Sequence, residues 1–503
     1  MNDIHDILQT GADAAPAIGA PGRAPLTYAG LRGLAGDTRK ALNAIGIGRG
    51  ERVAIVLPNG PEMAAAFVAV AGAASTAPLN PAYREDEFDF YLADLNAKAL
   101  VVMQGVETPA RAVAERRGIT VLELVADPDG LAGAFTLSGG TAGAAARPGA
   151  SQPDDEGLVL HTSGTTSRPK IVPLSQRNLA ASAGHIGATL SLTPDDRCLN
   201  IMPLFHIHGL IAAVLTSLAA GAEIVCSPGF NALKVFSWFD AVKPTWYTAV
   251  PTMHQAILSR AGRNPETVAA MDLRFIRSSS SSLPPPVMAE LEETFGCPVI
   301  EAYGMTEAAH QMACNQLPPG SRKAGTVGPA AGPEVAIMDP DGKILAQGDT
   351  GEIVIRGPNV FAGYEANPAA NAEAFADGWF RTGDQGVLDS DGFLSITGRL
   401  KEIINRGGEK IAPREVDDVI QAHPAVDQVV TFAKPHPKLG EEVAAVVVLK
   451  EGQRADEREL RDFAAAKLAD FKVPRTILFL DEIPKGATGK LQRIGLADKL
   501  GIT

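Results

Sequence analysis

Strand and helix patterns alternate along the first hundred residues, and this alternation constrains the possible fold more than any other feature of the sequence. Residues 27–47 space their apolar side chains as a helix does and end close to a glycine. Residues 52–57 (RVAIVL) form a short apolar run typical of a buried strand, and residues 61–74 are again helical. Repeated alternation of this kind is typical of α/β layers built on largely parallel sheets. The sequence therefore predicts the α/β class.

The length and the charge distribution predict two domains. A chain of 503 residues is longer than one hydrophobic core usually serves. Residues 127–157 are rich in Gly, Ala, Pro and Asp and predict a surface loop, and residues 350–400 predict short strands and turns. Beyond residue 400 the pattern becomes β-rich with two helices. Residues 1–400 carry 28 basic and 41 acidic side chains, whereas residues 401–503 carry 17 of each. We therefore expect a large domain over 1–400 and a small α+β domain over 401–503.

Composition excludes several classes of protein. The net charge is −13 and no basic stripe is present, so nucleic acid is not an expected partner. Four widely spaced cysteines without a CxxC pair argue against zinc or disulfide frameworks and favour a reducing compartment. No basic, apolar leader opens the chain, and no uncharged apolar run approaches the roughly 18 residues of a membrane span. These features predict a cytoplasmic protein without a membrane partner; the sequence does not indicate its oligomeric state.

One stretch predicts a phosphate-binding loop. Residues 158–161 (LVLH) have a strand pattern, and they lead into HTSGTTSRPK, which holds hydroxyl side chains, one glycine and Lys170. Backbone N–H groups and hydroxyls donate to phosphate oxygens in such loops, and a lysine supplies positive charge. The Walker A pattern is excluded, because Pro169 stands where that motif needs its second glycine. A solvated Ser/Thr turn is the alternative interpretation.

Seven stretches in one order resemble the ANL adenylate-forming enzymes, which include acyl-CoA synthetases, luciferases and peptide-synthetase adenylation domains. HTSGTTSRPK is the first, with Ser167 and Ile171 where many members have glycine. The others are MPLFHIHGL (202–210), RSSSSSLPPP (277–286), EAYGMTEAAH (301–310), WFRTGDQG (379–386), GRLKEIINRGGEKIAP (398–413) and PKGATGKLQR (484–493). The resemblance spans nearly the whole chain. It implies the ANL fold, with a large N-terminal domain and a mobile C-terminal domain.

The resemblance assigns a nucleotide site to this chain. Tyr303 is expected to stack on adenine, Asp384 to accept hydrogen bonds from the ribose hydroxyls, and Arg399 to reach the ribose or the phosphates. A carboxylate beside a triphosphate is repulsive unless a metal intervenes, so Glu307 is the expected Mg²⁺ ligand. The full expected set for ATP is Thr162, Ser163, Gly164, Thr165, Thr166, Lys170, Glu301, Ala302, Tyr303, Thr306, Asp384, Arg399 and Lys490.

The resemblance also implies two half-reactions in two conformations. A carboxylate first attacks the α-phosphate of MgATP to give an acyl-adenylate and pyrophosphate, and the thiol of coenzyme A then displaces AMP. Lys490 is the expected adenylation lysine, because a cation offsets charge that builds on the phosphoryl oxygens. Lys401 matches the hinge position. Gly407 and Gly408 are expected beside the pantetheine arm of coenzyme A, although a plain turn would also explain them.

Three histidines and one serine are candidates for the acid pocket. The stretches FHIHG, RSSSSS and EAAH supply His206, His208, Ser280 and His310. Imidazoles and hydroxyls donate to carboxylate oxygens, and burying a carboxylate without donors is costly. Such a pocket suits a second, non-reacting carboxylate on a short acid. The wording of these motifs is most similar to the oxalyl-CoA synthetases, whose oxalate contacts match His206, Ser280 and His310, with His208 as the other candidate.

The favoured hypothesis is therefore an AMP-forming ligase that joins oxalate to coenzyme A. Its expected catalytic residues are Lys490, Thr306, Glu307 and His206, with Thr306 contacting the α-phosphate. Malonate or another small acid is the second choice of substrate, and medium-chain or 4-coumarate-type acids are the third. A carrier-protein-loading adenylation enzyme and a nucleotide-binding scaffold without catalysis remain alternatives. The presence of Lys490, Glu307 and Asp384 argues against the scaffold.

Overall fold

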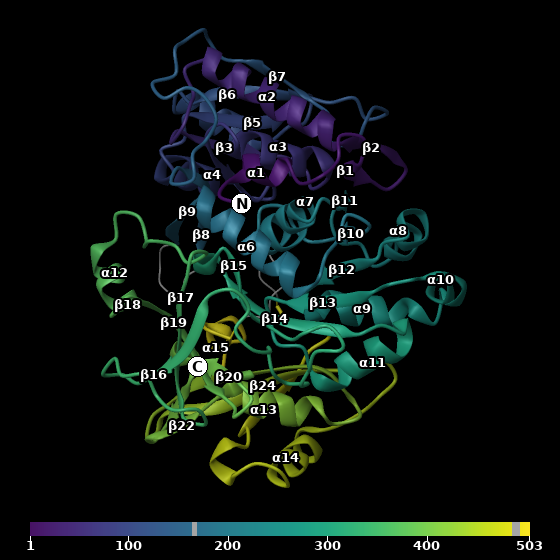
Figure 1. Ribbon diagram of the computed structural model, residues 1–503. Coiled ribbons are helices and arrows are strands. Elements are labelled where there is room, and N and C mark those ends of the chain that lie inside the picture. The colour runs from purple at the N-terminus through teal and green to yellow at the C-terminus, as the bar shows by residue number, and fades with distance from the viewer. Residues whose placement is uncertain (163–168, 485–492, 503) are drawn as a thin grey trace.

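Four β-sheets form the framework of the protein. The computed structural model describes residues 1–162, 169–484 and 493–502. Within these residues the strands form one eight-stranded, one seven-stranded and two five-stranded sheets (Figure 1). The first two sheets are built from residues before 315, and the fourth from residues after 403.

The eight-stranded sheet is mixed, with a parallel centre. Its order is β15-β14-β13-β12-β10-β11-β1-β2; only the two edge pairs, β15 with β14 and β2 with β1, are antiparallel. The strands are β1 (Pro16–Ala20), β2 (Arg23–Thr27), β10 (Arg197–Asn200), β11 (Glu223–Cys226), β12 (Trp246–Ala249), β13 (Phe275–Ser279), β14 (Val299–Met305) and β15 (His310–Cys314).

The seven-stranded sheet follows the same plan. Its order is β7-β6-β5-β3-β4-β8-β9, again with a parallel centre and antiparallel edges. The strands are β3 (Arg52–Val56), β4 (Ser75–Pro78), β5 (Ala99–Met103), β6 (Thr120–Val125), β7 (Thr136–Gly139), β8 (Glu156–Thr162) and β9 (Lys170–Ser175). These two sheets confirm the predicted α/β class and its largely parallel strands.

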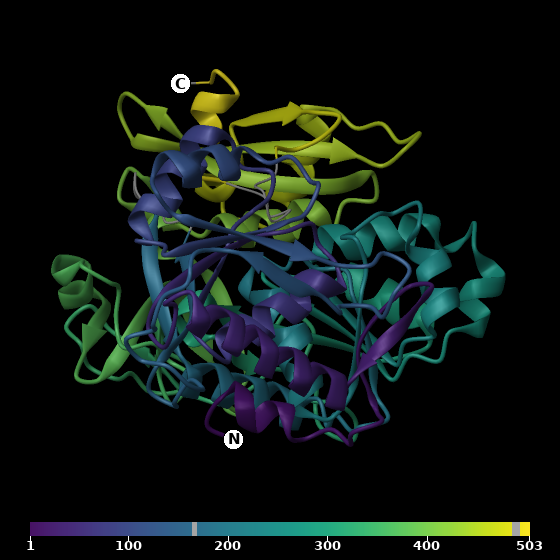
Figure 2. The same ribbon diagram turned by 90° about the horizontal axis from the view of Figure 1, so that it is seen from above.

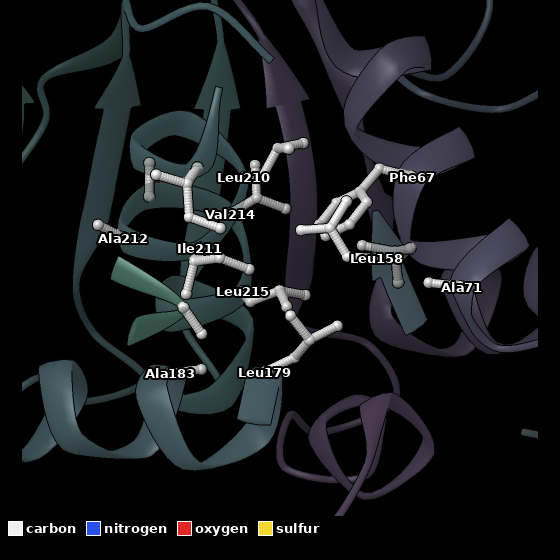
Figure 3. Close-up of a cluster of buried hydrophobic side chains, with 14 of the residues drawn as sticks. Phe67, Ala71, Leu158, Leu179, Ala183, Leu210, Ile211, Ala212, Val214 and Leu215 are labelled. Carbon is white, nitrogen blue, oxygen red and sulfur yellow. The ribbon is translucent and has the colours of Figure 1, made fainter. Parts of the chain in front are cut away.

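The main core lies between these two sheets. Helix α3 (Pro61–Ala71) is buried along its length except at Glu62 and contacts strands of both sheets, as its almost entirely apolar sequence predicts. Helix α6 (Gln176–Thr189) and the π-helical segment η1 (His208–Leu215) complete the layer. Figure 3 shows their side chains meeting: Phe67 from α3, Leu158 from β8, Leu179 from α6 and Leu210 from η1. Each such side chain contributes about 1.5–3 kcal/mol by leaving water.

The other helices either pack against the main core or cover the outer faces of the sheets. The predicted helix over 27–47 is α2 (Tyr28–Ala44), with the side chain of Thr27 as its N-cap. The remaining helices of the first two sheets are α1 (Ile4–Leu8), α4 (Glu85–Asp94), α5 (Pro109–Arg116), α7 (Thr216–Ala219), α8 (Val235–Val242), α9 (Pro251–Ala261), α10 (Pro265–Ala270), α11 (Pro285–Phe295) and the 3-10 turn η2 (Thr306–Ala308).

The segment 127–157 is more ordered than its composition predicts. The expected surface loop contains β7, which pairs with β6, and the buried Ser151, whose hydroxyl donates to the carbonyl of Ala71 at 2.9 Å. The loop prediction is therefore wrong in part. Small residues explain the difference, because Gly143 lets the backbone lie directly against Ile45, where a Cβ would approach the carbonyl carbon of Ile45 at 3.2 Å.

The third sheet also departs from the short strands and turns expected over 350–400. It holds β16 (Glu334–Met338), β17 (Thr350–Arg356), β18 (Phe375–Ala376), β19 (Trp379–Leu388) and β20 (Leu394–Arg399). Strand β19 runs for 10 residues, and helix α12 (Pro368–Ala374) precedes β18. A register shift between β17 and β19 brings in Gly383, whose φ of +75° turns the next residue toward the first sheet.

The last hundred residues form a separate small body (Figure 2). The 3-10 turn η3 (Leu400–Glu402) leads into a sheet of β21 (Ile404–Arg406), β22 (Glu409–Ile411), β23 (Val426–His436), β24 (Gly440–Leu449) and β25 (Thr476–Phe479). The two expected helices are α13 (Pro413–Gln421) and α14 (Glu457–Ala465); η4 (Asp470–Lys472) and α15 (Leu496–Lys499) are short additions. A large N-terminal and a small C-terminal domain are thus confirmed, while the division at residue 400 stays a prediction.

No helix in the three described segments combines the length and the apolar character that crossing a bilayer requires.

Candidate active site

Asp384 joins the first sheet to the third. It lies on β19, directly opposite Arg399 on β20, and the Arg399 Nε is 3.2 Å from its Oδ1. The hydroxyl of Tyr303, at the end of β14, donates to Asp384 Oδ2 at 2.5 Å. Burial raises the pKa of Tyr303 well above its usual value, which keeps this hydroxyl a donor. Three residues predicted to hold the nucleoside therefore meet at one carboxylate.

Glu307 lies in the same region as a buried carboxylate. Its side chain is 5% exposed, and its Oε1 accepts a hydrogen bond from the hydroxyl of Tyr364 at 2.8 Å. Burial raises the pKa of Glu307, while Tyr364, Lys170 and Arg399 act against that rise. The ammonium group of Lys170 is 4.3 Å from the ring centroid of Tyr364. A carboxylate that burial disfavours as an anion gains from a hard cation, so the site fits Mg²⁺ held between Glu307 and phosphate oxygens.

Tyr364 is a site residue that sequence reasoning missed. It belongs to no motif, and its partner Glu307 is 57 residues away. Within the described segments, no cluster of three or more His, Cys, Asp or Glu side chains has the arrangement of a metal site. Glu307 is therefore the one protein carboxylate that we expect to hold the metal, with nucleotide phosphates as further ligands.

The predicted loop is described only at its ends. Thr162 ends β8 and is paired with Lys170, the first residue of β9, so the two strands hold the ends of the loop together. The other predicted loop residues, Ser163, Gly164, Thr165 and Thr166, lie outside the described residues, as does Lys490, the expected adenylation lysine.

Three of the four candidate acid-pocket residues lie in one cluster. The two neighbouring histidines differ in their burial and in their contacts. His208 is fully buried, and its Nδ1 is 3.0 Å from Ser280 Oγ. The rings of His208 and His310 have centroids 5.1 Å apart. His206 is only partly buried, and its Nδ1 accepts the backbone N–H of His208 at 3.3 Å. The structure therefore brings His208, Ser280 and His310 into one cluster and places His206 beside it.

Unusual backbone conformations set the positions of the side chains in this cluster. Ser280 and His310 both have positive φ, +73° and +104°, which non-glycine residues adopt at a cost and mostly at functional sites. Gly304 makes the approach of His310 possible, because a Cβ on Gly304 would lie 2.0 Å from the carbonyl oxygen of His310. His208 is the first residue of η1, and π-helical turns are rare and frequent at functional sites.

Two further side chains, for which no role was predicted, lie against this cluster. Thr248 on β12 has its hydroxyl 2.6 Å from His208 Nε2. Arg277 on β13 is fully buried and lies against the same hydroxyl and Gln311. Arg277 opens the RSSSSSLPPP stretch and is a charged residue inside an apolar strand pattern, FIRSS, which is a signal that could have marked it. A buried charge without an obvious partner is the kind of residue that sequence reasoning should have questioned.

The residues predicted for domain movement and coenzyme A lie in the C-terminal part. Lys401 is exposed in η3, between the third and fourth sheets. Gly407 and Gly408 form the turn from β21 to β22 with φ of +60° and +101°. The turn alone requires both glycines, so their role beside the pantetheine arm stays a prediction, as does the role of Lys401 as hinge.

Comparison with known proteins decides the family. Residues 9–365 match the AMP-binding enzyme family, and residues 415–490 match the AMP-binding enzyme C-terminal domain. The chain belongs to the AMP-binding enzyme family. This confirms the resemblance to adenylate-forming enzymes that the motifs indicated, and ATP is the nucleotide seen in solved structures of similar proteins.

Relatives with assigned activities cover nearly the whole chain. The oxalate–CoA ligase of Arabidopsis thaliana is 45% identical over 494 residues, covering 95% of this chain and 94% of that protein. The oxalate–CoA ligase of Saccharomyces cerevisiae is 41% identical over 475 residues, covering 90% and 87%. The crystal structure of ATP-bound MatB from Rhodopseudomonas palustris has a TM-score of 0.89 at 32% identity and covers 99% of both chains.

Glu301 generates a prediction on pH dependence. It is 1% exposed, its Oε1 accepts the backbone N–H of Leu283 at 3.0 Å, and its Oε2 has no hydrogen-bond partner in the described part of the chain. Burial raises the pKa of Glu301 from 4.5 to about 7. Between these values the folded state binds more protons than the unfolded state. Stability contributed by this group is therefore lost as pH rises through that window.

The variant Glu301→Gln keeps an acceptor for Leu283 and removes the ionisation. We expect it to raise stability near pH 8 by about 1–3 kcal/mol and to change it little near pH 5. Thermal unfolding midpoints of both proteins across that pH range test this. The same pH dependence in the variant and the parent would contradict it.

Proposed function

We propose that the chain is an AMP-forming acid–thiol ligase that converts oxalate, ATP and coenzyme A to oxalyl-CoA, AMP and pyrophosphate. The observation that carries the proposal is the cluster of His208, Ser280 and His310 directly beside the nucleotide residues. Strand β14, the turn η2 and strand β15 form one hairpin, which carries Tyr303 and Glu307 on one side and His310 on the other. An acid bound at the cluster would thus lie next to the α-phosphate.

The polarity of the cluster supports a short diacid. A second carboxylate that enters a buried pocket needs hydrogen-bond donors, because leaving it bare costs several kcal/mol. The imidazole of His310 and the hydroxyl of Ser280 supply donors at this point, while both ring nitrogens of His208 contact Ser280 and Thr248. An apolar acyl chain would offer these donors no acceptor. The assigned activities of the Arabidopsis and yeast relatives support oxalate as that diacid.

The nucleotide residues support the first half-reaction. Asp384 offers its carboxylate to the ribose hydroxyls, Arg399 neutralises it, and Tyr303 fixes its orientation through a hydrogen bond. Lys170 and Arg399 supply positive charge to the region of Glu307, and Thr306 begins the adjacent turn η2. Glu307 would hold Mg²⁺, whose charge would offset that of the phosphate oxygens approached by the attacking carboxylate. Glu301 and Ala302, both buried on β14, position this segment.

For the C-terminal residues we propose a role in the change from the first to the second half-reaction. Lys490 provides the cation for adenylation and leaves when the small domain turns about Lys401. The turn of Gly407 and Gly408 then lies along the pantetheine arm, where an absent side chain leaves room; a Cβ on Gly408 would meet nothing within 4 Å. The four cysteines are all buried and free, which supports the proposed cytoplasmic location.

A malonate-type ligase is the second candidate function. The observation that favours it is the donor cluster itself, which would serve a slightly longer diacid as well. Medium-chain and 4-coumarate-type acids fit the polar cluster less well. A carrier-protein-loading enzyme would form the adenylate and release product without coenzyme A.

One prediction of the proposed function concerns the identity of the acid. AMP release that depends on ATP and coenzyme A should be fastest with oxalate in a panel that also contains malonate, acetate, octanoate and 4-coumarate. His310→Ala should remove the preference for oxalate by about tenfold or more, since a buried charged hydrogen bond is worth about 1.5–3 kcal/mol. His5→Ala, which changes an exposed histidine, is the control. A preference for octanoate or 4-coumarate would refute the polar pocket.

The second prediction concerns Lys490. Lys490→Ala should slow adenylate formation about 10²–10³-fold, because a transition-state contact with developing charge is lost. Thioester formation from preformed acyl-adenylate should remain close to that of the parent. Pyrophosphate exchange and thiol transfer measured separately test this, with Lys450→Ala, an exposed lysine, as control. An equal loss of rate in both half-reactions would contradict the assignment of Lys490 to adenylation alone.

The third prediction concerns Lys401. Lys401→Pro should leave pyrophosphate exchange largely intact and stop transfer to coenzyme A, because proline fixes φ near −65° and restricts the turn. Lys401→Ala keeps the backbone free and should retain both activities. A proline variant that makes the thioester at the parent's rate would show that the domains do not turn about this residue.

A further inference from the structure

Arg277 is a fully buried cation at the back of the acid-pocket cluster. It lies on β13, whose neighbour β12 places Thr248 opposite it. Its Nη2 donates to Gln311 Oε1 at 3.2 Å, and its Nη1 is 3.5 Å from Thr248 Oγ1, the outer limit of a hydrogen bond. No carboxylate in the described segments forms an ion pair with it.

The surroundings of Arg277 do not neutralise it. Its other polar neighbours are the thiols of Cys198 and Cys314, and burial raises the pKa of both, that of Cys314 to about 11, so both stay uncharged. A guanidinium remains protonated in proteins even where burial lowers its pKa. Burying an unpaired charge is expensive, and two neutral acceptors offset only part of that cost. A stabilising role alone does not explain this residue.

The position of the charge orients the hydroxyl of Thr248. A guanidinium has donors and no acceptor, so it attracts the Thr248 oxygen and repels the hydroxyl hydrogen. The hydrogen therefore points away from Arg277, toward His208 Nε2 at 2.6 Å. In a dry interior this preference is strong, because charge–dipole interactions are weakly screened there.

The orientation of Thr248 then fixes the proton of His208. If Nε2 accepts the hydrogen of Thr248, a neutral imidazole carries its own hydrogen on Nδ1. That Nδ1–H donates to Ser280 Oγ at 3.0 Å. The Ser280 oxygen then accepts the hydrogen bond from His208, so the hydroxyl hydrogen of Ser280 remains available to donate to a ligand. The opposite tautomer would use that hydrogen on Nδ1 and turn oxygen lone pairs toward the ligand.

We infer that Arg277 is a positioning residue of the acid pocket: through Thr248 it holds His208 as the Nδ1–H tautomer and thereby makes Ser280 a hydrogen-bond donor to a carboxylate. This chain of contacts begins at Arg277 on β13 and passes through Thr248 on β12 to His208 in η1. It ends at Ser280, which directly follows β13. Its effect on the bound acid rests on the proposed function, whereas the tautomer of His208 is a property of the protein alone.

The first experiment measures that tautomer in the ligand-free enzyme. Nitrogen-15 NMR of histidine-labelled protein distinguishes a protonated from an unprotonated ring nitrogen, and the signals missing from His208→Gln assign those of His208. The parent should show protonated Nδ1 and unprotonated Nε2. Arg277→Met and Thr248→Val should each shift the ring toward protonated Nε2. Protonated Nε2 in the parent, or one unchanged tautomer in both variants, would overturn the inference.

The second experiment separates positioning from a merely structural role. Arg277→Met should raise the KM for oxalate about tenfold or more and leave the KM for ATP within about twofold, because the lost donor faces only the acid. Arg277→Lys keeps a donor-only cation and should recover much of the loss. Arg263→Met, which removes an exposed arginine, should match the parent.

If Arg277→Met does not fold, the two KM values are measured in Thr248→Val instead, because valine keeps the shape of threonine without its hydroxyl. An unchanged KM for oxalate in Thr248→Val, or equal rises in both KM values, would overturn the positioning role. If the parent does not turn over oxalate at all, the proposed function fails, and the NMR result still tests this chain of contacts by itself.

Discussion

The hydrogen bond between Tyr303 and Asp384 is the contact on which the site depends. Tyr303 belongs to the eight-stranded sheet and Asp384 to the third sheet, so this bond joins the two sheets. Arg399, on the neighbouring strand of the third sheet, pairs with the same carboxylate. The backbone N–H of Phe361, which donates to the carbonyl of Glu307, and a shared apolar core also hold these two parts together. The bond to Tyr303 sets the orientation of the Asp384 carboxylate at their junction. Burial strengthens the arrangement, because a charged hydrogen bond is weakly screened away from water.

A protein with a net charge of −13 must meet anionic substrates with a few placed cations. Lys170 and Arg399 oppose the buried charge of Glu307, while Arg277 lies behind His208. These cations act at different points. The first two lie where phosphates are expected, and the third lies where a second carboxylate is expected. The division suits a reaction in which two anions must approach each other.

The sequence predicted those parts of the molecule that local pattern or motif encodes. Helices α2 and α3 and strand β3 follow from periodicity, and the motif resemblance indicated His206, Ser280 and His310, with His208 as the other candidate. In the structure it is His208 that lies with Ser280 and His310. Residues that act through distant partners were not predictable. Thr248 lies 40 residues from His208, and Tyr364 lies 57 from Glu307, so only the fold reveals their contacts. Strand β7 was missed because its backbone pairing needs no apolar alternation.

The central claim is that oxalate itself attacks the α-phosphate in this site, and oxygen transfer tests it most directly. Turnover of oxalate labelled with oxygen-18, together with ATP and coenzyme A, should yield AMP that carries one labelled oxygen and pyrophosphate that carries none. That pattern follows because the carboxylate oxygen stays on phosphorus when the thiol takes the acyl group. Labelled pyrophosphate or inorganic phosphate, or AMP without label, would contradict the account.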